Sequence, residues 1–163
     1  MAILVDYTYY KGSINIDTSK QSVKERLFEY SNLIEEKYLK KLLGNKTYYD
    51  YVANKTSAKY VNLLNKATFD SGSETYENDI KQMLAQFVYF HFITDDMGKN
   101  TPVGEVVPNV ETGVIGYNHS KLCNAYNKGV DLFNVAITYL SEQSVNFPDA
   151  SPIQLEKINS FGL

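Results

Sequence analysis

The sequence predicts a mainly α-helical protein, a bundle of about four to five helices with a protruding β-hairpin-like loop and an extended C-terminal tail. Three observations indicate this fold class. Apolar residues recur at steps of three or four over long stretches, as in amphipathic helices. Residues 98–117 hold several glycines and prolines, which exclude a regular helix there. Residues 144–163 carry apolar side chains around two further prolines.

The chain of 163 residues is long enough for one domain and too short for two independent cores. A compact chain of this length buries roughly 70% of the surface that its unfolded form exposes, so it needs no disulfide or metal to fold. We therefore expect one helical domain over residues 1–146, with the loop 98–117 inserted in it, and a docking tail over residues 147–163.

The first long helix is predicted to follow residues 13–16, which could form a short strand or an extended arm. Two residue pairs match the capping box, in which a hydroxyl and a side-chain carbonyl satisfy opposite backbone donors: Thr18 with Gln21, and Ser22 with Glu25. Apolar residues then form one stripe along about six turns: Val23, Leu27, Tyr30, Ile34, Tyr38 and Leu42. Gly44 can adopt the positive φ that ends such a helix.

Further helices are expected downstream. Two short ones are predicted over residues 47–53 and 57–67, and turn-forming residues at 70–73 predict a loop. The next long helix should run from about residue 74 to 95, with one broad apolar face: Tyr76, Ile80, Met83, Leu84, Phe87, Val88 and His91. The last should run from about residue 118 to 143, with its own stripe: Leu122, Tyr126, Gly129, Phe133, Ile137 and Leu140.

Two segments do not fit helices. The loop 98–117 contains β-branched residues that favour an extended hairpin: Val103, Val106, Val107, Val110, Val114 and Ile115. A stretch of this length without helix is usually functional or disordered, and its valines argue against disorder. The tail is rich in apolar residues that an isolated chain has few places to bury: Phe147, Ile153, Leu155, Ile158, Phe161 and Leu163. Pro148 and Pro152 break the helix before it.

The charge distribution argues against tight binding of nucleic acid. The net charge is −3, and the longest basic cluster, Lys37 with Lys40 and Lys41, directly follows Glu35 and Glu36. A protein that grips phosphates normally has a basic excess or a basic stripe. A small DNA-binding regulator is therefore a weaker alternative, although a wall past which DNA slides needs no attraction.

No constellation of residues predicts catalysis or a cofactor, and we expect a protein that is not an enzyme. His91 and Asp95 stand four residues apart and could face one metal ion, but no further ligand pattern completes a site. Cys123 is the single cysteine, which excludes a cysteine-based zinc site. A metal-dependent or hydrolytic enzyme built on His91 and Asp95 stays a competing hypothesis.

The ends and the aromatic content give further expectations. The N-terminus has no basic leader, and no stretch approaches the roughly 18 apolar residues of a membrane span, so we expect a protein made in the cytoplasm without a membrane segment. There are 14 tyrosines and no tryptophan. The clustered ones suit both a bundle core and a subunit interface, because tyrosine offers a large area and a polar tip: Tyr9, Tyr10, Tyr48, Tyr49 and Tyr51.

Several motifs resemble those of the head-to-tail adaptor proteins of tailed phages. The segment from Glu35 to Gly44, followed by Tyr48 and Tyr49, resembles the acidic, tyrosine-leucine and leucine-leucine-glycine segment of that family. An aromatic run at residues 87–92 and the Thr-Pro-Val-Gly sequence at 101–104 follow in the family's order. Lys41 stands where relatives often have proline. The likeness spans residues 20–145 and is greatest to the ring proteins beneath the portal in crAss-like phages.

The resemblance implies a virion protein at the head-to-tail interface. Its members form homo-oligomeric rings, commonly of twelve subunits, that bind the portal protein and continue the DNA channel towards the tail. We expect the tail, with Phe147, Pro148, Ile153 and the apolar residues after them, to dock on the portal or on a neighbour. We expect the valine-rich loop to contact another subunit or another ring or tail protein. A tail-completion or stopper protein of the same assembly is the alternative; in either case DNA passes without sequence-specific binding, and no membrane is involved.

Overall fold

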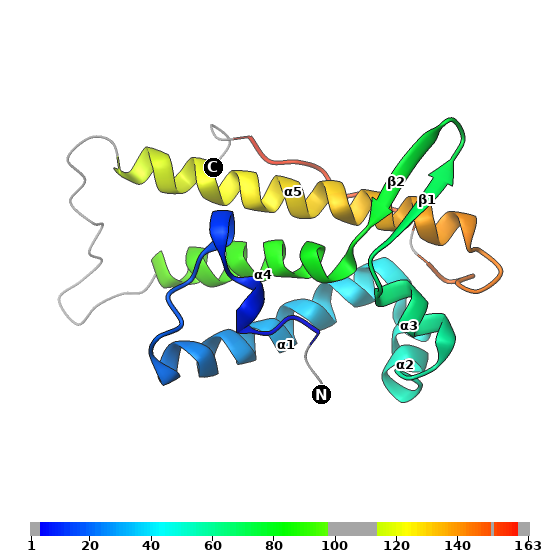
Figure 1. Ribbon diagram of the computed structural model, residues 1–163, viewed down its shortest axis with the longest axis horizontal. Coiled ribbons are helices and arrows are strands. Elements are labelled where there is room, and N and C mark those ends of the chain that lie inside the picture. Colours follow the sequence, from blue (N-terminus) through cyan, green and yellow to red (C-terminus); the bar gives the residue numbers. More distant parts are fainter. Residues whose placement is uncertain (1–3, 98–113, 151, 160–163) are drawn as a thin grey trace.

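The computed structural model describes residues 4–97, 114–150 and 152–159, and it describes side chains over 4–95, 119–150 and 152–159. Three long helices form its body: α1 (Gln21–Leu43), α4 (Ile80–Met97) and α5 (Val114–Glu142). They lie side by side, with α4 between the other two (Figure 1). The predicted mainly α-helical fold class, with five α-helices, a β-hairpin and an extended tail among the described residues, is confirmed.

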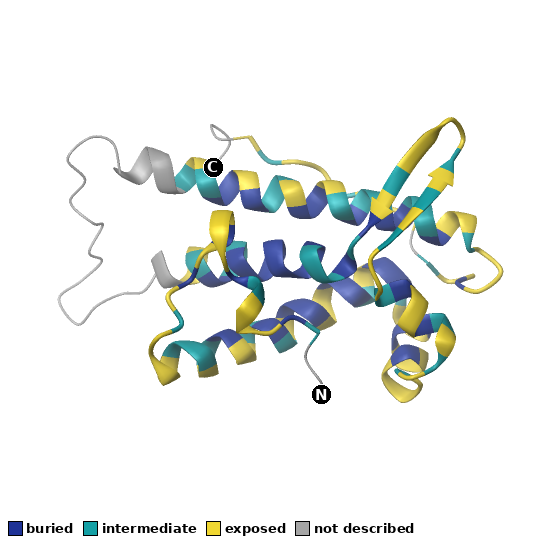
Figure 2. Cartoon of the chain, in the orientation of Figure 1, coloured by how far each residue is buried: buried dark blue, intermediate teal, exposed yellow. Residues whose placement is uncertain are grey.

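Helix α4 forms the centre of the core because it packs against α1 on one side and α5 on the other (Figure 2). Met83, Phe87 and Val88 have no exposed surface. The ring of Phe87 stacks on Tyr38 of α1, with centroids 3.8 Å apart. On the other side, a Cβ at Gly129 of α5 would stand 2.9 Å from Phe87, so only glycine lets α5 approach this closely.

Two short helices, α2 (Asn45–Ala53) and α3 (Ala58–Leu64), follow α1 and lie at its C-terminal end, as the sequence predicts (Figure 1). Gly44 joins α1 directly to α2 with φ +74°, and its N–H donates to the carbonyl of Lys40 at 3.0 Å. The positive φ expected for Gly44 is therefore present, although ψ 159° differs from the usual left-handed helix end. α3 stops at Leu64 rather than at residue 67.

A β-hairpin takes the place of the predicted helix start at residue 74. Strands β1 (Ala67–Ser71) and β2 (Glu74–Asn78) pair antiparallel, with Ser71 opposite Glu74 and Gly72 at φ +63° in the two-residue turn. Phe69 faces Tyr76 across the strands, with ring centroids 5.6 Å apart. Phe69 also contacts Tyr139 of α5 at 5.1 Å. Cross-strand aromatic pairing and packing on α5 thus outweigh the helical periodicity of this segment.

The N-terminal segment is neither a strand nor a capped helix start. It contains two 3₁₀ turns, η1 (Tyr7–Tyr9) and η2 (Gly12–Ile14), in place of the short strand or arm predicted at residues 13–16. Helix α1 begins at Gln21 with Lys20 as N-cap, and the Lys20 side chain makes no capping bond. The two predicted capping boxes were therefore wrong as markers of the helix start.

Helix α5 begins at Val114, four residues before the predicted start at about residue 118. The loop prediction for Val114 and Ile115 was therefore wrong. Residues 98–113, where an extended hairpin is expected, lie outside the described residues. None of the helices that the structure describes is both long and apolar enough to cross a bilayer.

Candidate subunit interfaces

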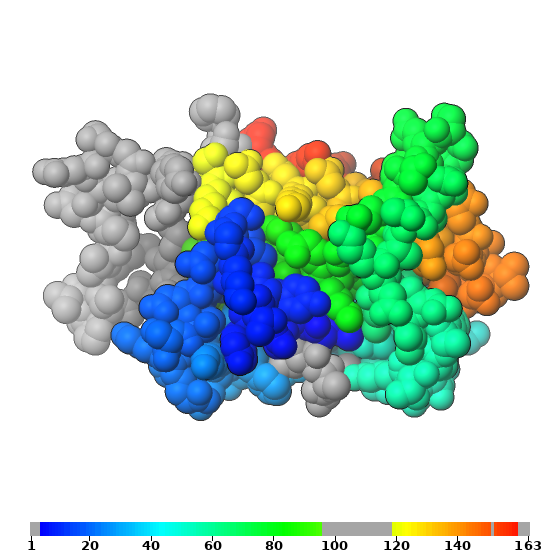
Figure 3. Space-filling model, viewed as in Figure 1, coloured from blue at the N-terminus to red at the C-terminus, as the bar shows by residue number. Residues whose placement is uncertain are grey.

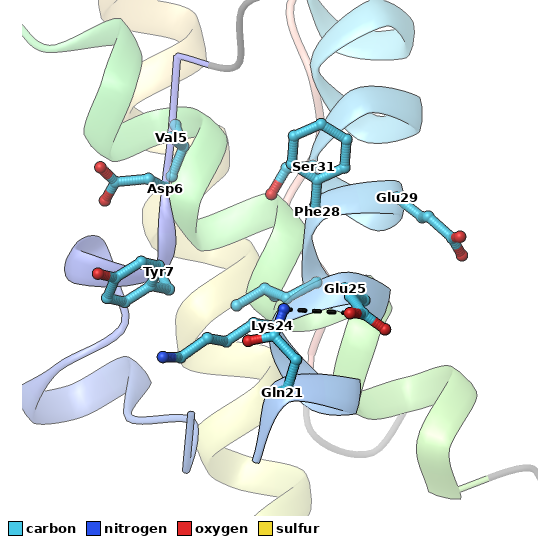
Figure 4. Close-up of a pocket in the computed structure, with 10 residues that line it drawn as sticks. Val5, Asp6, Tyr7, Gln21, Lys24, Glu25, Phe28, Glu29 and Ser31 are labelled. Atoms are coloured by element: carbon cyan, nitrogen blue, oxygen red, sulfur yellow. Dashed lines mark hydrogen bonds between the residues drawn. The ribbon is translucent and has the colours of Figure 1, made fainter. Parts of the chain in front are cut away.

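A groove of about 690 Å³ lies between the N-terminal segment and the first half of α1 (Figure 4). Val5 and Leu27 line its floor and are buried. Tyr7 and Phe28 line its walls, yet 50% and 55% of their surfaces are exposed. Two half-exposed rings beside a buried apolar floor are typical of a surface that another chain covers.

The rim of this groove is mainly acidic. Glu25 and Glu29 lie on the α1 side, and Asp6 lies across from them on the N-terminal segment (Figure 4). Among the described residues that line the groove, the single cation is Lys24, whose Nζ stands 4.9 Å from the centre of the Tyr7 ring. The groove therefore combines apolar walls with an excess of negative charge.

The buried carboxylate of Glu35 holds the N-terminal wall in place. Its Oε1 accepts the backbone N–H of Val5 at 2.9 Å, and both of its oxygens lie 3.1 Å from the nitrogen of Leu4. Only 6% of the residue is exposed. Burial raises the pKa of Glu35 to about 7, against the opposing effects of these N–H donors and of the nearby Lys55 charge.

Glu35 and Glu36 diverge around α1, as their adjacent positions predict. Glu36 is exposed and pairs with Lys40, with 2.6 Å between Oε1 and Nζ. Glu35 points to a different side of the helix, where it anchors residues 4 and 5. Glu35 therefore binds the backbone of the N-terminal segment, whereas Glu36 forms an ion pair at the surface.

A second group of exposed apolar residues lies at the other end of α1, on α2 and α3. Tyr49 and Val52 are three residues apart on α2, and Val61 lies on α3. All three are exposed, Tyr49 by 61%. The charged residues of α2, α3 and the turn between them are mostly basic: Lys46, Lys55 and Lys59, with Asp50 as the one acid. We call these residues the α2–α3 face.

The start of the predicted docking tail belongs to the core. Phe147 is only 4% exposed, and its ring centre lies 6.2 Å from that of Tyr60. Lys59 covers the same ring, with Nζ at 4.9 Å. Asp149 accepts a bond from the Thr47 hydroxyl at 3.4 Å. Pro148 between them is exposed. The extended part of the tail therefore begins after Ala150 rather than at residue 147.

Residues 152–159 run back along α5 as an extended segment, antiparallel to the helix (Figure 1). The Asn134 amide donates to the carbonyl of Leu155 at 3.0 Å and accepts from its N–H at 2.9 Å. Asn127 makes the same pair of bonds with Ile158, at 2.7 and 2.8 Å. Lys157 pairs with Asp131 between them at 2.8 Å. We call Asn127 and Asn134 the asparagine clamp.

The remaining predicted interface residues are placed as follows. Ile153 is 66% exposed, whereas Leu155 and Ile158 are half-buried in the extended segment beside α5. Phe161 and Leu163 lie outside the described residues. So do the loop residues Val103, Val106, Val107 and Val110, while the side chains of Val114 and Ile115 are not described. The structure brings no loop residue together with a tail residue over the described part of the chain.

The candidates for metal or acid–base chemistry have structural roles. His91 is partly buried, and its Nε2 lies 3.1 Å from the Tyr38 hydroxyl. Burial, with the Lys37 charge as a smaller cause, lowers the pKa of His91 to about 4. Asp95 is exposed. Cys123 is buried, and its sulfur lies 3.5 Å from Nε2 of His119. Over the described ranges, no three potential ligands gather in a metal-binding group.

The periodicity of the sequence missed the residues that matter most for these surfaces. Phe28 lies outside the predicted apolar stripe of α1, and a large apolar residue outside the stripe is itself a signal of an exposed patch. Asn127 and Asn134 stand seven residues apart on one helix face, a spacing of about two turns. No pattern in the sequence predicts that their side-chain amides bind the backbone of residues 155 and 158.

Comparison with known proteins gives one match. Residues 39–113 are similar to a protein family described as a family of unknown function (DUF6712). That segment extends from the end of α1 through α4. No curated protein and no solved structure matches the chain.

Proposed function

We propose that this protein is a structural subunit of a tailed-phage connector, a head-to-tail adaptor that forms a ring beneath the portal and extends the DNA channel towards the tail. Its work is mechanical joining rather than catalysis. The motifs in residues 35–49, 87–92 and 101–104 favour this role, and the groups that could perform chemistry, such as His91, are engaged in packing.

The observation that carries the proposal is the presence of two different exposed apolar surfaces on one small chain. The groove with Tyr7 and Phe28 lies at the N-terminal half of α1. Helices α2 and α3, which carry the second set of exposed apolar residues, lie at the other end of α1 (Figure 1). A ring needs a heterologous contact, in which two different patches of each subunit meet. A catalytic domain has no such need.

The charges support a role as a wall rather than as a DNA-binding protein. The net charge is −3. Several lysines of the described residues pair with carboxylates: Lys40 with Glu36, Lys66 with Glu77 and Lys157 with Asp131. DNA that must slide past a surface requires weak attraction or none.

The decisive experiment measures the mass of the chain mixed with the portal protein of the same phage. We expect one complex that contains a ring of adaptor subunits on the portal. A truncated variant that lacks residues 152–163 should keep its helical circular dichroism, because Phe147 and Asp149 are retained. The same variant should lose co-assembly if the tail docks on the portal. The earlier boundary at residue 147 is unsuitable, since it removes core side chains.

The outcome separates the alternatives. A stopper or tail-completion protein would bind only a preformed adaptor–portal complex and not the portal alone. A DNA-binding regulator would retain DNA on a filter with a steep dependence on salt concentration. Failure to enter any portal complex, with or without other connector proteins, would refute the proposal.

A further inference from the structure

We infer that the groove of one copy receives the α2–α3 face of a second copy, so that subunits join through these two surfaces in a head-to-tail order. This inference rests on the proposal that copies of the chain assemble with one another. It adds which surfaces meet and which residues select the partner.

The first argument is the apolar fit. The groove has a buried floor at Val5 and Leu27 and exposed rings at Tyr7 and Phe28. The α2–α3 face offers Tyr49 and Val52, which project from the same side of α2 because they stand three residues apart. A helix that lays its exposed apolar residues into an apolar groove is a recurrent mode of recognition.

The second argument is charge. In the part of the chain that the structure describes, the groove is lined by Asp6, Glu25 and Glu29 against the one cation Lys24. The α2–α3 face has the opposite composition, with three lysines against Asp50. Complementary charges around an apolar contact steer association and reject wrong partners, because like charges in contact are repelled.

The third argument is that neither surface suits a copy of itself. Two grooves would bring six carboxylates and two lysines together, and two α2–α3 faces would bring together six lysines and two aspartates. An isologous dimer through either surface is therefore disfavoured. The pairing of unlike surfaces is heterologous, and it closes into a ring when the rotation between subunits allows.

The anchoring of each surface to the core makes the pairing specific. The Glu35 carboxylate fixes the groove wall through the backbone of Leu4 and Val5. The α2–α3 face is fixed by Tyr60, whose hydroxyl donates to the Asp50 carboxylate and lies 3.3 Å from the carbonyl oxygen of Thr47. Because both surfaces are held by buried contacts, binding costs little ordering of the backbone.

A charge exchange tests the inference on the full-length chain. The groove variant carries Glu25→Lys and Glu29→Lys, and the face variant carries Lys46→Glu and Lys55→Glu. Each variant alone should self-associate about tenfold more weakly than the wild type or worse, because its two surfaces now carry like charges. The equimolar mixture should regain association in sedimentation equilibrium, since each surface then meets its complement on the other variant.

Matched controls separate this effect from net charge and from misfolding. Glu156→Lys and Lys128→Glu make the same types of change at exposed positions outside both surfaces and should leave association unchanged. Helical circular dichroism should be the same for all variants. Phe28→Ala and Tyr49→Ala should each weaken association without loss of fold, because both rings are exposed in the single chain.

Three results would overturn the inference, and they differ from the one that would refute the proposed function. Self-association of the groove and face variants at wild-type strength, or a mixture no stronger than its components, would show that other surfaces meet. A wild-type chain that stays monomeric alone yet enters a portal complex would reject this pairing while the adaptor role stands. Absence from every portal complex would reject the role itself.

Discussion

Gly44, at the corner between α1 and α2, lies directly against the backbone carbonyl of Asp149, which follows α5. A Cβ added at Gly44 would stand 2.3 Å from that oxygen. The contact joins residues more than 100 positions apart, and the bond from Thr47 to Asp149 reinforces it. Gly44 therefore does two things: it turns the chain at positive φ, and it makes room for the segment that carries Phe147.

Gly44→Ala should destabilise the fold by more than about 2 kcal/mol, because strain at positive φ adds to a backbone collision. Gly12→Ala is the matched control: Gly12 also has φ +64°, but a Cβ there meets nothing within 4 Å. Its cost should be about 1 kcal/mol. Denaturant unfolding of both variants measures the difference, and equal losses would show that the Asp149 contact is unimportant.

The asparagine clamp should control the tail. Asn127→Ala with Asn134→Ala removes four hydrogen bonds to the backbone of residues 155 and 158. Each of these bonds contributes about 0.5–1.5 kcal/mol, so their loss should release residues 152–159 from α5 while the helices stay folded. Hydrogen exchange of the Leu155 and Ile158 amides should speed up at least about tenfold. Asn124→Ala, at an exposed position on the same helix, should leave both rates unchanged; slow exchange in the double variant would contradict the clamp.

Glu35 should make the fold more stable in mild acid than at alkaline pH. Its pKa in the folded state is raised from 4.5 to about 7, so the folded protein holds this proton more tightly than the unfolded chain. The resulting stability is present below pH 4.5 and is lost as pH rises through 7, by up to about 3 kcal/mol. Glu35→Gln keeps an acceptor for the Val5 N–H and should flatten this dependence. Parallel pH profiles of the two proteins would contradict the prediction.

His91 should act in the opposite direction. Its pKa is lowered from 6.5 to about 4, so the unfolded chain takes up the proton first as the solution is acidified. Its contribution is therefore present above pH 6.5 and is lost as pH falls towards 4, by about 2 kcal/mol after allowance for its partial exposure. An NMR titration of the imidazole should show a neutral ring at pH 5.5. A midpoint near 6.5 would refute the burial argument.

The long helices were predictable because their signal is local and repeated. The stripe from Val23 to Leu42 predicted α1, and the face from Tyr76 to His91 predicted α4, although Tyr76 itself lies in β2. Each stripe reports burial against a neighbour without naming it. The short helices α2 and α3 were found for the same reason, and Gly44 marked the corner between α1 and α2.

The hairpin and the helix starts were not predictable in this way. Residues 67–78 contain Thr68, Phe69, Thr75 and Tyr76, a β-branched and aromatic pattern around Gly72 that competes with the helical reading of residues 74–80. The deciding contact is between Phe69 and Tyr139, 70 residues away in the sequence. At the start of α1, the capping boxes are common patterns, and the structure uses neither.

For the interface residues too, local patterns predicted some features and contacts between distant residues decided the others. The apolar content of the tail was visible in the sequence, but its division was not: Phe147 enters the core, whereas Ile153 stays exposed. Tyr49 was a candidate on composition, while Phe28 and the asparagine clamp were not. Whether such side chains are buried depends on elements that are distant in the chain. The hydrophobic periodicity of a segment therefore cannot predict it.

By itself the sequence determined the fold class, because hydrophobic periodicity is a property of neighbouring residues and specifies which face of each helix must be buried. Only the tertiary structure decided where the hairpin pairs, where the tail begins, and how Glu35 and Gly44 hold the two ends of the chain against the helices. Those outcomes depend on contacts over 30 to more than 100 residues, where close approach and desolvation select one arrangement.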